Sequence, residues 1–153
     1  MSSYLGFEKN ISYFTIPAAV VLALLPRVYS GLTGPGKKFF DPNNPRSFTS
    51  KLEAAELDKK LKGRLQRAES AGANAFENLG VYAAAVTAGN AAGLPVEALN
   101  DLTLGYLAAR VIYTWIYIWG QENRRITPLR TVVWGIAMSC CMALFSLAGI
   151  RGL

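Results

Sequence analysis

Three polar side chains lie in, or just before, an alanine-rich stretch at residues 68–92. Arg67, Asn74 and Glu77 are separated by seven and three residues, so a helix places them on one face. Guanidinium groups bind carboxylates through paired hydrogen bonds. A charge inside a membrane span costs at least roughly 2.5 kcal/mol and is usually functional. This stripe is therefore a candidate binding surface.

A second polar stripe follows in residues 96–120 and just beyond. Arg110, Tyr113, Tyr117 and Arg124 occur at intervals of three, four and seven residues, again on one helical face. Nearby cations and hydroxyl donors lower the pKa of a thiol and so favour the nucleophilic thiolate. Together the stripes indicate a site for an anionic ligand with carboxylates, or for a thiol that reacts as its thiolate.

The same charges also permit a purely structural interpretation. Glu77 is expected to neutralise Arg110 inside a helix bundle, while the tyrosines anchor the membrane interface. A surplus of positive charge favours the binding site instead. Four arginines lie near the predicted cytoplasmic ends of the spans, and few carboxylates are there to match them. They are Arg67, Arg124, Arg27 and Arg125.

Several kinds of chemistry are excluded by composition. The chain has no histidine, and its two cysteines, Cys140 and Cys141, are adjacent in an apolar run. Histidine-based acid–base catalysis is therefore absent, and no disulfide framework or zinc site can be built. We expect no metal site, and we interpret both cysteines as small packing residues of a membrane helix.

The elements that would position the two stripes are membrane helices. Hydrophobic residues make up 52% of the 153 residues and charged residues only 17%, whereas soluble domains carry about 25% charged residues. The apolar runs are close to the length that crosses a bilayer. They predict an all-α integral membrane four-helix bundle, a single domain over residues 1–153, with spans at 11–29, 68–92, 96–120 and 129–150.

The connection at residues 31–64 is basic and begins with glycines and prolines. Its first half is expected to be a loop, with a helix that begins near Ser50 and runs on into the second span. Nine of the sixteen lysines and arginines lie between residues 31 and 67, and Arg124, Arg125 and Arg130 flank the last turn. By the positive-inside rule these loops face the cytoplasm. Because the basic residues serve topology, no nucleic-acid partner is expected.

The two stripes resemble the signatures of the MAPEG family, the membrane-associated proteins in eicosanoid and glutathione metabolism. The run RAESAGANAFENLGVY, which begins at Arg67, resembles the family's Arg-Ala and Asn-x-x-Glu-Asn pattern. The run ARVIYTWIYIWGQENRR, which begins at Ala109, resembles its Ala-Arg-x-x-Tyr-x-x-x-Tyr segment with a following arginine. The four-span layout agrees over the whole chain.

The resemblance implies a homotrimer that binds glutathione as a co-substrate between subunits near the cytoplasmic face. It implies glutathione contacts from Arg67, Asn74, Glu77, Arg110, Tyr113, Tyr117 and Arg124. Among these, Arg124 would stabilise the thiolate with Tyr113 or Tyr117. Arg110 would be mainly structural, with Glu77 or Asp101 as its partner. The implied function is a membrane-bound glutathione transferase or peroxidase acting on small lipophilic electrophiles that partition into the lipid. The membrane would be the endoplasmic reticulum of a eukaryote or the inner membrane of a bacterium.

Two alternatives remain open. Some family members have an arginine where Ser70 stands, and many have histidine where Gly72 stands. These departures favour an isomerase or cyclase that acts on a hydrophobic metabolite without glutathione. The other alternative is a non-enzymatic membrane scaffold whose polar stripes only specify helix packing.

Overall fold

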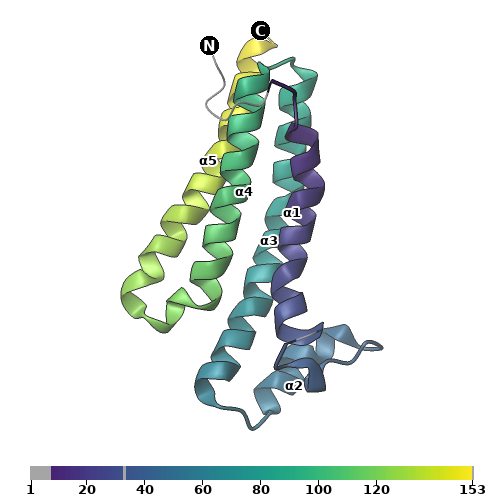
Figure 1. Ribbon diagram of the computed structural model, residues 1–153, viewed down its shortest axis with the longest axis vertical. Helices are drawn as coiled ribbons and strands as arrows, with labels where there is room; N and C mark the ends of the chain where they lie inside the picture. Colours follow the sequence, from purple (N-terminus) through teal and green to yellow (C-terminus); the bar gives the residue numbers. More distant parts are fainter. Residues whose placement is uncertain (1–7, 33, 153) are drawn as a thin grey trace.

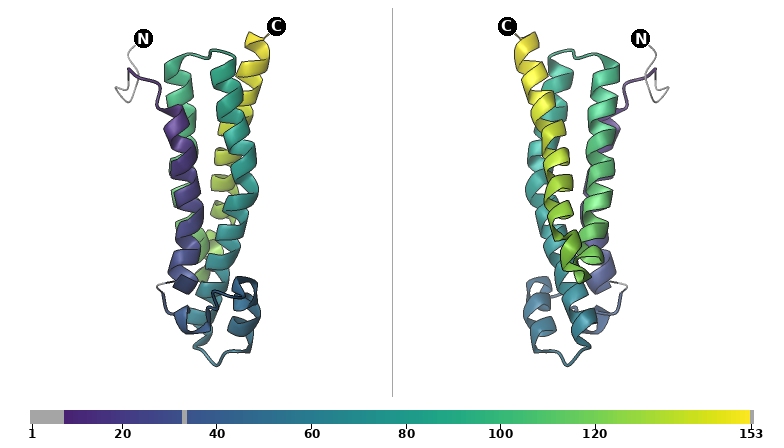
Figure 2. Two further views of the ribbon diagram at one scale, coloured as in Figure 1. Left: turned by 90° about the vertical axis from the view of Figure 1, so that its right-hand side faces the viewer. Right: turned by 90° about the vertical axis from the view of Figure 1, so that its left-hand side faces the viewer.

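Four long helices run side by side in the computed structural model, which describes residues 8–32 and 34–152 (Figure 1). They are α1 (Ser12–Arg27), α3 (Lys59–Ala91), α4 (Val96–Ile118) and α5 (Thr127–Arg151). The described residues contain no strand. The two further views show α3 and α4 joined by a short turn at one end, while the basic connections lie at the other end (Figure 2). We call these the turn end and the basic end.

Two of the helices are apolar enough to cross a membrane by length and composition alone. One is α1 with its extension, Ser12–Leu32, at a mean hydropathy of 1.5, and the other is α5, at 1.9. By contrast, α3 and α4 carry the polar stripes. At 33 residues, α3 is about 50 Å long and exceeds a hydrocarbon core of about 30 Å. It therefore extends well beyond the predicted second span toward the basic end.

At the basic end, α1 passes directly into a π-helical turn, η1 (Val28–Leu32). Pro17 and Pro26 both lie inside α1, so two of its backbone N–H donors are missing from the helix. π-helical turns are rare and often occur at functional sites. Here the turn places Tyr29 against the bases of α3 and α4, next to Ala68 and Ile118.

The connection between α1 and α3 folds into short helical pieces that pack on α3. These are η2 (Lys37–Phe39), η3 (Pro45–Ser47) and α2 (Phe48–Ala54). Phe48 and Leu52 of α2 form a small buried cluster with Leu65 of α3. The expectation of one helix from Ser50 into the second span is wrong, because the chain is extended at Ala55. Helix α3 starts afresh at Lys59, where the Asp58 side chain accepts a hydrogen bond from the N–H of Leu61 at 2.9 Å.

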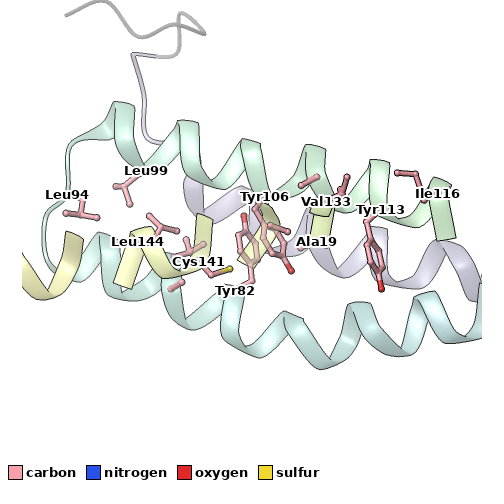
Figure 3. Packing of buried hydrophobic residues seen from close by; sticks show 14 residues of the cluster. Ala19, Tyr82, Leu94, Leu99, Tyr106, Tyr113, Ile116, Val133, Cys141 and Leu144 are labelled. Carbon is pink, nitrogen blue, oxygen red and sulfur yellow. The ribbon is translucent and has the colours of Figure 1, made fainter. Parts of the chain in front are cut away.

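The main core runs along the bundle between α3, α4 and α5, from Leu94 at the turn end to Ile116 near the basic end (Figure 3). Tyr82 and Tyr106 stack at its centre with ring centroids 3.7 Å apart. The Tyr82 hydroxyl donates to Thr15 Oγ1 at 2.5 Å, which ties α1 to α3. Beyond the core, Asn100 of α4 accepts from the N–H of Ile11 at 3.0 Å and fixes the start of α1. The turn end is thus pinned, and the polar stripes lie toward the basic end.

Candidate functional site

The stripes of α3 and α4 face each other at two points. Near the basic end, Arg67 Nε and Nη2 donate to the carbonyl oxygen of Ile118, the last residue of α4, at 3.1 and 3.0 Å. Two turns deeper, Arg110 Nη1 donates to Asn74 Oδ1 at 3.1 Å. In both contacts a side chain of α3 reaches α4, and the two α3 side chains are seven residues apart. The expected juxtaposition of the two stripes therefore exists within one chain.

Arg110 is the most buried charge of the site, with 5% of the residue exposed. Its guanidinium carbon lies 4.6 Å from the centre of the Tyr113 ring. Its Nη2 has no hydrogen-bond partner among the described residues. The expected ion pair with Glu77 is wrong, because Glu77 is exposed on another face of α3. Asp101 is exposed as well. Arg110 is therefore held by an amide and an aromatic ring rather than by a carboxylate.

Tyr113 and Tyr117 lie one turn apart on α4, and each ring faces a guanidinium. Their centroids are 5.5 Å apart in an edge-on arrangement. Arg130 of α5 lies over the Tyr117 ring at 4.6 Å, as Arg110 does over Tyr113. With its amide oxygen turned toward Arg130, Gln121 accepts from Nη1 and Nε at 2.6 and 3.1 Å. We call Arg110, Tyr113, Tyr117 and Arg130 the Arg–Tyr ladder.

The sequence interpretation used Arg130 only for topology and did not consider Gln121. No spacing within one stripe could have found them, because they reach the ladder from α5 and from the turn before it. Neither guanidinium of the ladder has a carboxylate partner within residues 8–32 and 34–152. The ladder thus combines two phenol hydroxyls with two positive charges that no acid in the described part of the chain neutralises.

At the basic end, one carboxylate gathers three cations of α3. Glu122 of η4 (Gly120–Glu122) accepts from Arg64 at 2.5 Å and from Lys60 at 3.0 Å, and Arg67 lies at 3.6 Å. The hydrogen bonds from Arg64 and then Lys60 lower the pKa of the Glu122 carboxyl. We call these four residues the Glu122 clasp. Three cations against one acid leave a net charge of about +2.

The clasp corrects the expectation that few carboxylates match the cations at this end. Glu122 contacts Arg67, and Glu69 accepts from Arg27 at 3.1 Å. Glu69 also accepts from the Ser30 hydroxyl at 2.5 Å, which ties η1 to α3. Sequence spacing gave no sign of either acid, since each lies on a different element from its main partner. The side chain of Arg124 lies outside the described part of the chain, although its backbone begins η5 (Arg124–Ile126).

The family departures at Ser70 and Gly72 lie on a different face of α3. Both residues line a hollow of about 510 Å³ between α1, α3 and the η3–α2 segment, together with Arg27, Arg46 and Glu69. A Cβ on Gly72 would lie 3.6 Å from the Ala23 carbonyl oxygen and from Pro26 Cβ. The glycine therefore permits close packing of these two helices.

A model of the MAPEG family matches residues 12–150. The chain belongs to the MAPEG family. The match confirms the resemblance and covers the four long helices except for the last residue of α5. This MAPEG protein is therefore membrane-associated and belongs to a family of glutathione and eicosanoid metabolism. Comparisons with curated proteins and with solved structures gave no match.

The geometry of this MAPEG protein suits the recognition of an anion. Positive charge and hydroxyl donors are lined up along α4 and the start of α5, and a second positive cluster lies at the basic end. Such donors hold carboxylates and stabilise a thiolate. The family includes enzymes such as transferases, and the ladder is the part of the fold that best fits such chemistry.

Proposed function

We propose that this protein is a membrane-bound glutathione-dependent transferase or peroxidase that acts on lipophilic electrophiles. The observation that carries the proposal is the Arg–Tyr ladder, in which Arg110 and Arg130 flank Tyr113 and Tyr117 without a carboxylate partner among the described residues. An anion is the missing complement of this arrangement. Glutathione supplies two carboxylates and a thiol, and MAPEG membership makes it the expected anion.

In the transferase reaction, the glutathione S–H bond breaks and the proton leaves to water. The thiolate is stabilised by the guanidinium of Arg124 and by a hydroxyl hydrogen bond from Tyr117 or Tyr113. Its sulfur lone pair attacks the electrophilic carbon and forms a C–S bond. The leaving group departs with its bonding electrons, or an added proton completes an addition. The apolar part of the electrophile would remain in the membrane.

The remaining site residues would hold the tripeptide. Arg67 would bind a carboxylate, Asn74 would hydrogen-bond the peptide backbone, and Glu77 would accept from the α-ammonium. Arg110 would position Asn74 through their 3.1 Å hydrogen bond. Because Arg67 already donates to the carbonyl of Ile118, its capacity for the ligand lies in its remaining N–H donors.

We further propose that the working unit is a homotrimer with its basic end toward the cytoplasm. Two faces of α3 support an inter-subunit site. Asn74 faces α4 of its own chain, while Glu77 is exposed and Ser70 lines the separate hollow beside α1. A ligand between two subunits could contact the first face of one copy and the second face of its neighbour. The basic loops suit the cytoplasmic side, of the endoplasmic reticulum in a eukaryote or of the inner membrane in a bacterium.

The test is glutathione titration by calorimetry into the protein in lipid nanodiscs, followed by conjugation assays with a lipophilic electrophile. We expect binding below millimolar concentration. Tyr117→Phe and Arg124→Ala should each lower kcat/KM by at least about tenfold, which corresponds to about 1.4 kcal/mol. Matched controls are Tyr13→Phe and Arg151→Ala, which alter exposed residues near the turn end. A folded trimer that binds no glutathione at millimolar concentration would refute the proposal.

A second candidate is an isomerase or cyclase that acts on a hydrophobic metabolite without glutathione. The observation in its favour is that Arg67 is occupied by Ile118 and Glu122, while Ser70 provides no positive charge nearby. Turnover of a lipophilic substrate by protein stripped of glutathione would support this candidate. Turnover that depends strictly on added thiol would exclude it.

A further inference from the structure

An apolar groove of about 470 Å³ lies between α1 and α4, apart from the Arg–Tyr ladder. Leu22, Leu25 and Tyr29 line it from α1 and η1, and Val111, Trp115 and Trp119 line it from α4. Several of these side chains open to the outside of the protein. Trp115 is 59% exposed, and Leu25 and Val111 are each 50% exposed. The groove is thus a surface feature of the membrane-embedded part of the chain.

Two aromatic rings close the groove at the basic end. Tyr29 and Trp119 lie with ring centroids 5.3 Å apart. Tyrosine and tryptophan are enriched where lipid headgroups begin, because their rings are apolar and their polar atoms reach water. This pair therefore marks the depth at which the acyl chains of a lipid end and its headgroup starts.

The Glu122 clasp lies directly beyond this aromatic pair. Trp119 is followed in the chain by η4, which carries Glu122. The pKa of the Arg64 guanidinium is raised, first by its hydrogen bonds to Glu122 and also by the Tyr29 hydroxyl beside it. Lys60, the outermost cation of the clasp, has 67% of its side chain exposed. Positive charge in excess of Glu122 is therefore available just past the mouth of the groove.

We propose that the α1–α4 groove together with the clasp binds an anionic phospholipid of the surrounding bilayer. One acyl chain lies in the groove, and the lipid phosphate lies beside Lys60 and Arg64. The acyl chain is already out of water in the bilayer, so the groove holds it by shape and van der Waals contact rather than by the hydrophobic effect. Basic pockets between membrane helices recognise anionic headgroups. Charge complementarity selects this occupant, because a second copy of the chain would present its own positive clasp at the same depth.

The experiment uses tryptophan quenching by lipids with brominated acyl chains. Trp115 and Trp119 line the groove, and the chain has three tryptophans in all. In a Trp134→Phe background, emission therefore reports the groove alone. The full-length protein is placed in phosphatidylcholine nanodiscs, and brominated phosphatidylglycerol or brominated phosphatidylcholine is titrated in. About 1 kcal/mol for each of two cations predicts roughly a 30-fold preference for the anionic lipid.

Charge variants locate the headgroup. Lys60→Gln with Arg64→Gln should abolish the preference, whereas Lys60→Arg with Arg64→Lys keeps the charge and should retain it. The matched control, Lys37→Gln with Lys38→Gln, removes two exposed cations from the same end and should leave the preference intact. If the double glutamine variant does not fold, the single variants Lys60→Gln and Arg64→Gln decide the outcome, because each should lower the preference about fivefold.

Three results would overturn the proposal. Equal quenching by both brominated lipids would mean that any bilayer lipid occupies the groove, without preference for an anionic headgroup. Absence of quenching by either lipid would mean that the groove is covered, for example by a neighbouring subunit. A preference that survives loss of the Lys60 and Arg64 charges would place the headgroup elsewhere. None of these readouts depends on glutathione, so the proposed enzymatic function is tested separately.

Discussion

Replacement of Arg110 by methionine is predicted to destabilise the protein only slightly, although it removes a buried charge. Arg110 makes one hydrogen bond, to Asn74 at 3.1 Å, and one cation–π contact, to Tyr113 at 4.6 Å. Their loss removes about 1.5–3 kcal/mol and about 0.5–2 kcal/mol, respectively. The same change also removes the buried Nη2, which has no hydrogen-bond partner among the described residues. Removal of such an unsatisfied group stabilises the folded protein by about 1–3 kcal/mol, or more when the group is charged. The net change should be about 1–2 kcal/mol.

The side-chain amide of Asn74 accounts for most of this net destabilisation. In Arg110→Met the Asn74 Oδ1 atom, which is partly buried, loses its donor, and an unsatisfied acceptor costs up to about 1–3 kcal/mol. The double variant Arg110→Met with Asn74→Leu replaces both groups by apolar side chains. Such paired replacement is often neutral or stabilising. We therefore expect the double variant to lie within about 1 kcal/mol of the native protein, so that the two substitutions are strongly coupled.

The measurement is reversible unfolding in mixed detergent and SDS micelles, followed by tryptophan fluorescence, for the native protein, both single variants and the double variant. Arg151→Met, which changes an exposed arginine, is the control and should show no effect. A loss above about 4 kcal/mol in both Arg110→Met and the double variant would refute the reasoning. It would mean that Arg110 has an ionised partner, for instance a carboxylate of a neighbouring subunit.

Three further predictions concern packing and the clasp. Tyr82→Phe removes a buried hydroxyl that donates to Thr15 at 2.5 Å and should destabilise by about 1 kcal/mol; an unchanged unfolding midpoint would contradict that bond. Gly72→Ala should be tolerated, because the added Cβ would lie 3.6 Å from atoms of α1, an ordinary contact distance. Gly72→Leu should destabilise the protein by about 1–3 kcal/mol through overpacking. Both are measured in the same unfolding assay, with the alanine variant as the control. The pKa of Glu122 is lowered by Arg64 and Lys60, so its contribution is full above the unfolded value near 4.5 and is lost as pH falls through the lower folded value. Unfolding midpoints followed across this acidic range should show that loss, and Glu122→Gln should remove that part of the pH dependence; an identical acid profile in the variant would argue against the clasp.

The helices could be predicted because their ends and their faces are encoded by residues close together in the sequence. Gly93 and Pro95 separate the second and third spans, and the structure ends α3 at Ala91 and begins α4 at Val96. Gly93 has a positive φ of 66°, which glycine adopts without strain. The helical period also predicted that Arg67 and Asn74 share a face, and both contact α4. In each case the information lies within a few residues of the feature.

The partners of the charges could not be predicted in the same way. Glu122 and Arg130 reach the site from different elements, so their contacts depend on how the α4–α5 turn is placed against α3. Periodicity groups residues on a face but does not say which neighbour that face meets. The expected ion pair between Glu77 and Arg110 failed for this reason, because the amide of Asn74 occupies the position that the carboxylate was expected to fill.

The position of Glu77 on α3 is explained better by a neighbouring subunit than by any contact within the single chain. Three residues along a helix turn the side chain by about 300°, so Glu77 points about 60° away from Asn74, which faces α4. Glu77 is consequently exposed within the predicted span, where an uncovered charge costs at least roughly 2.5 kcal/mol. A neighbouring subunit, or the ammonium group of a ligand held between subunits, would remove that penalty. The exposed glutamate therefore supports the proposed inter-subunit site more directly than any residue buried within one copy.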